Sequence, residues 1–188
     1  MKTILLENTE SESARAVCLP DSALVLQGRP LFIPHYAEEF SVFFCPVVKI
    51  TRVGKTIGER FAGRYYSEIA PMIRLAAADD PYPQSALISC GDSMAYLGNF
   101  SAMPEDPDAG ITFTLGGSLM EQPGEMTVDA VRRLMDRAIS LVSRKMTLKN
   151  GDLVSPVSIR LTGARTPVPD TDITATAPDG TGSRFRFK

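Results

Sequence analysis

The chain has 188 residues, 44% of them hydrophobic, and its 20 basic and 22 acidic residues give a formal net charge of −2. This length and composition predict one globular domain whose core needs no metal or disulfide to fold. No basic run is longer than two residues, which argues against a nucleic-acid-binding protein.

The cysteines, the single histidine and the apolar runs indicate where the protein acts and which sites it lacks. Cys18, Cys45 and Cys90 show no CxxC or zinc spacing, so we expect unpaired thiols in a reducing compartment. His35 is the only histidine, which excludes His-rich metal sites. The first residues carry only three consecutive apolar side chains, too few for a signal peptide, and no run of about 18 follows. A cytoplasmic protein with no membrane contact is predicted.

The first quarter of the chain reads as short strands. Strands are predicted at residues 3–6, 23–26 and 31–33, separated by turn residues. Residues 40–53 are strand-like throughout, and Pro46 in their middle predicts an edge, a bulge or a break there.

Two helices are predicted in the remainder. The first starts near Ile57 and ends or kinks at Pro71, with an apolar face made by Ile57, Phe61, Tyr65, Ile69 and Met72. The second spans 128–145, with Thr127 as its N-cap. Residues 172–188 alternate around Asp179-Gly180 and predict a terminal hairpin. Two helices among many short strands predict an α+β or mostly β fold.

Four sequence blocks, in this order, carry a resemblance to a known family. They are LPDSAL (19–24), KITRVGKTIGERFAGRYYSEI (49–69), YLGNF (96–100) and TLKNGDLV (147–154). With them the chain resembles the small bacterial members of the fumarylacetoacetate hydrolase family, in their catalytic-domain form. The resemblance implies a mixed β-roll with two main helices, usually forming a homodimer. It covers residues 1–188 as a single domain, with an N-terminal lid region shortened by roughly nine residues.

The resemblance also implies a chemistry. Family members cleave, decarboxylate or isomerise diketo and oxo acids with a divalent cation, usually Mg²⁺, held by a Glu-x-Glu strand and an aspartate. Such all-oxygen ligation suits a hard ion that acts as a Lewis acid. A His-Glu pair activates water, and a lysine and a threonine bind the substrate.

Other residues stand at the matching positions of this chain. The two glutamate positions fall on Phe43 and Cys45, and the aspartate position falls on Arg74. The catalytic histidine falls on Ser13 with its partner on Ala16, the lysine falls on Ser89, and the threonine loop reads Pro156-Val157-Ser158-Ile159. The sequence therefore predicts no metal ligands and no confident catalytic residue, and no cofactor is expected.

These substitutions predict a pseudoenzyme that has lost the metal-dependent keto-acid chemistry. It could still bind a small carboxylate, with Arg74, Phe43, Cys45 and Asp92 as candidate substrate-binding residues, because a guanidinium forms bidentate bonds to a carboxylate.

Two alternatives stay open. One is an active Mg- or Mn-dependent hydrolase, isomerase or decarboxylase with a rebuilt site, for which Asp79, Asp92, Cys45 and His35 are the candidates. The other is a non-catalytic subunit or interaction protein.

Overall fold

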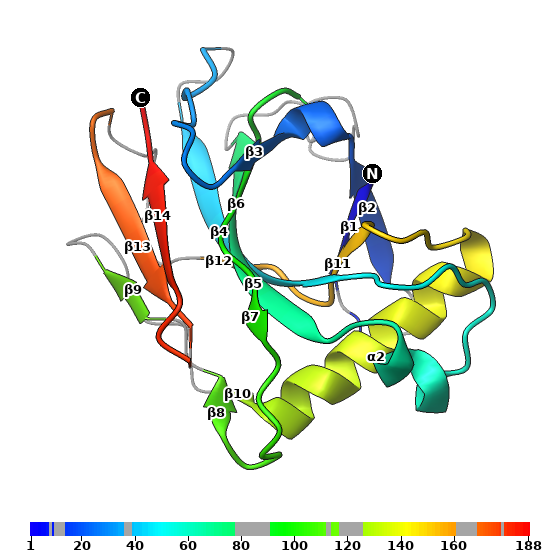
Figure 1. Ribbon diagram of the computed structural model, residues 1–188. Helices are drawn as coiled ribbons and strands as arrows, with labels where there is room; N and C mark the ends of the chain where they lie inside the picture. The colour runs from blue at the N-terminus through cyan, green and yellow to red at the C-terminus, as the bar shows by residue number, and fades with distance from the viewer. Residues whose placement is uncertain are drawn as a thin grey trace.

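The computed structural model describes residues 1–7, 9, 14–35, 39–77, 91–111, 114–116, 126–160, 169–177 and 179–188. Its main feature is a nine-stranded sheet that curls into a half-barrel (Figure 1). Strand order is β2-β1-β11-β4-β5-β6-β3, with β12 beside β4 and β7 beside β5. The bounds are β1 Thr3–Glu7, β2 Arg15–Leu19, β3 Leu24–Leu26, β4 Phe40–Lys49, β5 Glu68–Ala77, β6 Ala95–Leu97, β7 Ser101–Ala102, β11 Leu153–Ser155 and β12 Ile159–Arg160.

Two smaller sheets and a helical layer complete the described part. One sheet pairs β8 (Gly110–Ile111) with β10 (Met126–Thr127). The other joins β9 (Thr114–Gly116), β13 (Asp172–Thr176) and β14 (Gly182–Arg186). The helical elements are the 3-10 helices η1 (Asp21–Ala23) and η2 (Glu59–Arg64) and the α-helix α2 (Val128–Lys145). The mostly β fold predicted from the sequence is confirmed.

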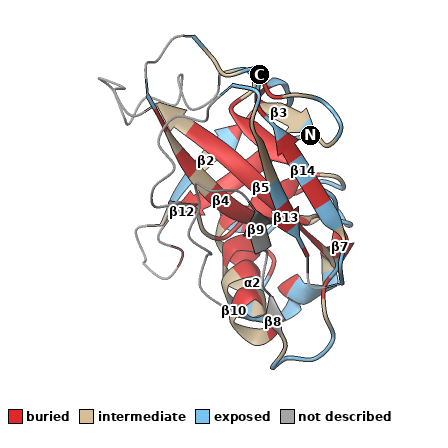
Figure 2. Ribbon diagram, turned by 90° about the vertical axis from the view of Figure 1, so that its left-hand side faces the viewer, coloured by how far each residue is buried: buried red, intermediate tan, exposed pale blue. Residues whose placement is uncertain are grey.

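The centre of the large sheet is the antiparallel pair β4–β5. Its register runs from Phe40 opposite Ala77 to Val48 opposite Ile69. Seven of the ten β4 residues and seven of the ten β5 residues are buried, so both faces of this pair are covered. Figure 2 shows this concentration of buried residues in β4, β5 and α2.

Pro46 and Pro71 lie directly opposite each other in this pair. Neither has an N–H, so they cannot exchange ladder hydrogen bonds. Pro71 instead turns its carbonyl oxygen away from β4, where it accepts a 2.8 Å bond from the Gly98 N–H. On the other side, β11 pairs with β4 at Val48 and Lys49, and β12 pairs at Phe43 and Phe44. Pro46 therefore faces the β11–β12 connection. The predicted edge, bulge or break at Pro46 is wrong, because β4 is continuous and central. The interruption lies beside it, between β11 and β12.

The predicted helix from Ile57 to Pro71 is wrong. Only η2 is helical, with i→i+3 bonds such as Phe61 N–H to Gly58 O at 2.8 Å. Two glycines, Gly58 and Gly63, weaken an α-helix here. From Glu68 the chain becomes β5, because pairing with β4 on one side and with β6 and β7 on the other satisfies its backbone.

The predicted second helix and terminal hairpin are confirmed. α2 spans Val128–Lys145, and the Thr127 hydroxyl accepts a 3.2 Å bond from the Ala130 N–H as predicted for an N-cap. Its apolar face is buried, and the helix packs against η2 and β11. β13 and β14 pair in register from Asp172 opposite Arg186 to Thr176 opposite Gly182. No helix among the described residues is long and apolar enough to cross a membrane.

Candidate functional site

Three of the positions singled out in the sequence lie together on one face of β4–β5. Phe43 and Cys45 are two residues apart in β4 and so point to the same side of the sheet. Arg74 is the direct cross-strand partner of Phe43, and its guanidinium carbon lies 5.7 Å from the Phe43 ring centroid. Cys45 is fully buried, and Arg74 is only 5% exposed. We call Phe43, Cys45 and Arg74 the β4–β5 locus.

Ser158 joins this locus from the β11–β12 connection. The Cys45 thiol donates to the Ser158 hydroxyl oxygen at 3.4 Å. The following strand, β12, pairs Ile159 with Phe44 and Arg160 with Phe43. Residues from three segments of the chain therefore meet as the resemblance implies, although none of them is a carboxylate.

The locus lies on the face of the sheet that the terminal hairpin does not cover. Tyr96 pairs with Ile73, so it points to the side opposite Arg74. On that side its ring meets Phe185 of β14 edge-on, with centroids 5.0 Å apart. In Figure 1 the hairpin lies outside the curl of the large sheet, so Phe43, Cys45 and Arg74 belong to its concave face.

The locus does not fit a hard divalent cation. Mg²⁺ and Mn²⁺ take oxygen ligands, but here they would meet an aromatic ring, a thiol and a fixed positive charge. At about 5 Å, a guanidinium would repel a divalent ion by about 7 kcal/mol at an effective dielectric constant of about 20. In the described part of the chain, no group of three or more His, Cys, Asp or Glu side chains is placed to hold a metal.

The other candidates do not join the locus. Ser13, Ser89 and Asp79 lie outside the described residues. Asp92 is exposed in the turn before β6, and His35 is exposed in a turn after β3. No contact between described residues links either side chain to Cys45 or Arg74, so they build no acid–base pair there.

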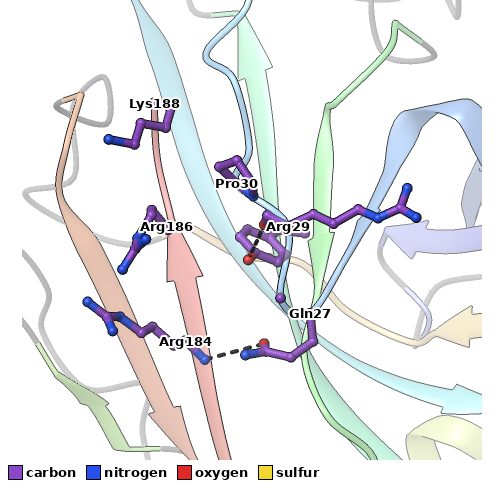
Figure 3. Close-up of a pocket in the computed structure, with 8 residues that line it drawn as sticks. Gln27, Arg29, Pro30, Arg184, Arg186 and Lys188 are labelled. Carbon is purple, nitrogen blue, oxygen red and sulfur yellow. Dashed lines mark hydrogen bonds between the residues drawn. The ribbon is translucent and has the colours of Figure 1, made fainter.

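Two cavities lined by described residues lie away from the β4–β5 locus. One, with a volume of about 370 Å³, borders β3 and Met1. The other has a volume of about 240 Å³ and lies between the turn at 27–30 and β14 (Figure 3). Its lining residues are Gln27, Gly28, Arg29, Pro30, Tyr96, Arg184, Arg186 and Lys188. We call it the β14 pocket.

The β14 pocket is not among the sites predicted from the sequence. No basic run is longer than two residues, but the cations of SRFRFK (183–188) occur at every second position. A period of two places these cations on one face of a strand, so the alternation itself predicts a row of positive charges.

Comparison with known proteins places the fold. No protein-family profile matches the sequence, and no curated protein matches it. Solved structures match along its whole length. A 5-carboxymethyl-2-hydroxymuconate delta-isomerase from Mycobacterium smegmatis superposes with a TM-score of 0.77 at 16% identity, covering 99% of this chain and 78% of the isomerase.

Two further structures agree. A fumarylpyruvate hydrolase from Pseudomonas aeruginosa, solved with Mn²⁺ and pyruvate, matches with a TM-score of 0.77 at 16% identity over 100% of this chain and 89% of the hydrolase. A structure described as a fumarylacetoacetate hydrolase family protein from Yersinia pestis matches with a TM-score of 0.77 at 17% identity, over 100% and 93% of the two chains. This chain therefore has the fold of the fumarylacetoacetate hydrolase family.

Proposed function

We propose that this protein is a pseudoenzyme of the fumarylacetoacetate hydrolase family, without the metal-dependent chemistry on diketo and oxo acids. One observation carries the proposal: Phe43, Cys45 and Arg74 gather on one sheet face, at the positions that the resemblance gives to three carboxylate ligands. The strands that carry these positions are retained, and the metal-binding side chains are replaced.

The replacement puts a cation where the resemblance gives a carboxylate. A set of three carboxylates contributes −3, which a divalent cation largely offsets. Here Arg74 contributes +1, with an aromatic face beside it. The ligand class that suits such a site is a small organic carboxylate held by the guanidinium, without a metal to polarise its carbonyl.

Calorimetric titration of the full chain with MnCl₂ and MgCl₂ tests the loss of the metal. We expect no saturable binding with a Kd below about 1 mM, equivalent to about −4 kcal/mol. The matched control is the triple variant Phe43→Glu, Cys45→Glu, Arg74→Asp, which restores the ligand types and should gain Mn²⁺ affinity if it folds. Micromolar Mn²⁺ binding by the wild type, together with metal-dependent turnover of oxaloacetate, would overturn the proposal.

Calorimetric titration with pyruvate tests whether the β4–β5 locus binds a small carboxylate. Arg74→Met should abolish pyruvate binding, Arg74→Lys should retain part of it, and Arg133→Gln should leave it unchanged because Arg133 is an exposed residue of α2. Equal binding by the wild type and Arg74→Met would remove Arg74 from the proposed site.

A further inference from the structure

β14 presents a row of cations on one face. Ser183, Phe185 and Phe187 are buried, and the residues between and after them, Arg184, Arg186 and Lys188, are exposed. Alternate residues of a strand are about 7 Å apart, so three positive groups follow one another along the pocket wall. Figure 3 shows Arg184, Arg186 and Lys188 in this row, with their side chains directed away from the 27–30 turn, while the Arg29 side chain extends in the other direction, away from the row.

Asp172 of β13 and Asp170, which precedes that strand, hold these cations without neutralising them all. Asp172 accepts hydrogen bonds from both Arg184 and Arg186, and Asp170 pairs with Lys188. Three cations thus share two carboxylates. Counted by side chains, the row has three positive groups and two negative ones, an excess of +1. The bonds from Arg184 also hold the pKa of Asp172 below its ordinary value, so this carboxylate stays charged.

The opposite wall adds donors and fixes the shape of the pocket. The Gln27 side-chain oxygen accepts the backbone N–H of Arg184 at 3.3 Å, which leaves its amide N–H groups for another acceptor. Gly28 has a φ of +89°, a conformation that glycine adopts without strain, and this lets the turn close over the pocket. The Tyr96 hydroxyl donates to the Arg29 carbonyl oxygen and ties the turn to β6.

We propose that the β14 pocket binds a small organic anion, either a dicarboxylate or a phosphate monoester. The guanidinium groups retain N–H donors beyond those used on Asp172, because each carries five. Asp172 orients both guanidinium groups before a ligand arrives, which lowers the entropy lost on binding. The positive excess of the row favours an anionic ligand. The pocket is separate from the β4–β5 locus, since Tyr96 and Arg74 point to opposite faces of the sheet.

Calorimetry on the full chain at constant ionic strength tests the pocket, with succinate and inorganic phosphate as probes and sodium chloride as the control. At least one probe should bind with a Kd below about 1 mM and a stoichiometry of one. Tighter binding of succinate assigns the dicarboxylate, and tighter binding of phosphate assigns the phosphate monoester.

Variants locate the binding. Arg186→Gln should weaken it by at least about tenfold, as expected for loss of a charged donor, and Lys188→Gln by about threefold. Lys188→Gln removes only an exposed ion pair, so it keeps the test valid if Arg186→Gln fails to fold. Arg133→Gln removes an exposed, ion-paired cation on α2 and should bind as the wild type does.

Three results would overturn the proposal: neither probe binds saturably above the chloride control, Lys188→Gln and a folded Arg186→Gln bind like the wild type, or Arg74→Met alone abolishes binding. The last result would assign the anion to the β4–β5 locus and would support the proposed function, so the two ideas fail separately.

Discussion

Asp152 ties the N-terminus of the chain to the turn before β11, and its removal should be strongly destabilising. The residue is only 2% exposed. Its carboxylate accepts the backbone N–H of Lys149 at 2.7 Å and that of Lys2 at 3.2 Å, and it also pairs with the Lys2 ammonium. Asp152→Ala would therefore remove the acceptor of two backbone donors and one ion pair.

The size of the effect follows from these bonds. A hydrogen bond to a charged group contributes about 1.5–3 kcal/mol, and because both N–H groups of this pair are part-buried we take the low end, about 3 kcal/mol for the two. The Lys2 side chain is 30% exposed, so its ion pair adds at most about 1 kcal/mol. Asp152→Ala should lower the free energy of unfolding at pH 7 by about 3–4 kcal/mol.

Urea unfolding followed by circular dichroism measures this change. Asp152→Asn keeps one acceptor oxygen and should lose only about half as much. Lys2→Met isolates the ion pair and should lose about 1 kcal/mol or less. A loss below about 1 kcal/mol for Asp152→Ala would refute the reasoning, since it would fall short of even one charged hydrogen bond.

The pH dependence has a definite sign. Burial alone would raise the pKa of Asp152, but the bonds from Lys2 and from the Lys149 N–H outweigh it and lower the pKa below its ordinary value of 3.8. The stabilisation is therefore fully present above pH 3.8 and is lost as the pH falls through the folded-state pKa. The difference between the wild type and Asp152→Ala should shrink only in that acid range.

Two other substitutions test the packing around the sheet. Gly98→Ala would place a Cβ 2.5 Å from the Ser183 hydroxyl oxygen and should lower the free energy of unfolding by about 1–3 kcal/mol in urea titrations, the usual range for overpacking. Tyr66→Phe removes the 2.9 Å bond from its hydroxyl to Asp136 and should lower stability by about 1.5 kcal/mol at pH 7. Burial raises the pKa of Asp136 and this bond opposes the rise, so the loss should diminish once acid protonates Asp136.

Each of these substitutions has a control in the same region. A Cβ at Gly182 would have no atom within 4 Å, so Gly182→Ala should leave stability nearly unchanged. Tyr65 is only half-buried, and its hydroxyl bonds to no described residue, so Tyr65→Phe should change stability by less than about 0.5 kcal/mol. Equal losses for a variant and its control would contradict the packing and hydrogen-bond arguments.

The elements that the sequence predicted well carry local signals. α2 has an apolar face of period 3.6 and the Thr127 cap, and both act within one segment of the chain. The terminal hairpin alternates on both sides of Asp179-Gly180, so its register is set by the turn.

The start of β5 was mistaken for the end of a helix because its signals are not local. It is buried on both faces, so its sequence EIAPMIRLAA shows no alternation. A short apolar run of this kind cannot be assigned by periodicity, and here the pairing partners decide. Pro71 indicated a helix end because proline lacks the N–H that a helix needs. A β-strand needs the same donor, so the residue does not distinguish the two structures.

The β4–β5 locus was predicted by counting from sequence blocks. That method brought Phe43, Cys45, Arg74 and Ser158 to one place, as the cross-strand register and the Cys45–Ser158 bond show. It could not give the burial of Arg74, which depends on elements distant in the sequence. Whether the locus binds a carboxylate stays a prediction.

The facing prolines of β4 and β5 also restrict which residues of the two strands can lie opposite each other. In an antiparallel pair, opposite residues point their backbone groups either both toward each other or both away, and Pro46 and Pro71 take the second arrangement. A shift of the register by one residue would require one of the two strands to turn about its own axis. The proline nitrogen of that strand would then face the partner strand at a position where an N–H donor is needed. A register shift of β4 against β5 by an odd number of residues therefore costs backbone hydrogen bonds, whatever the side chains do. The strand alignment that brings Phe43 opposite Arg74 is in this way supported by backbone groups that take no part in the candidate site.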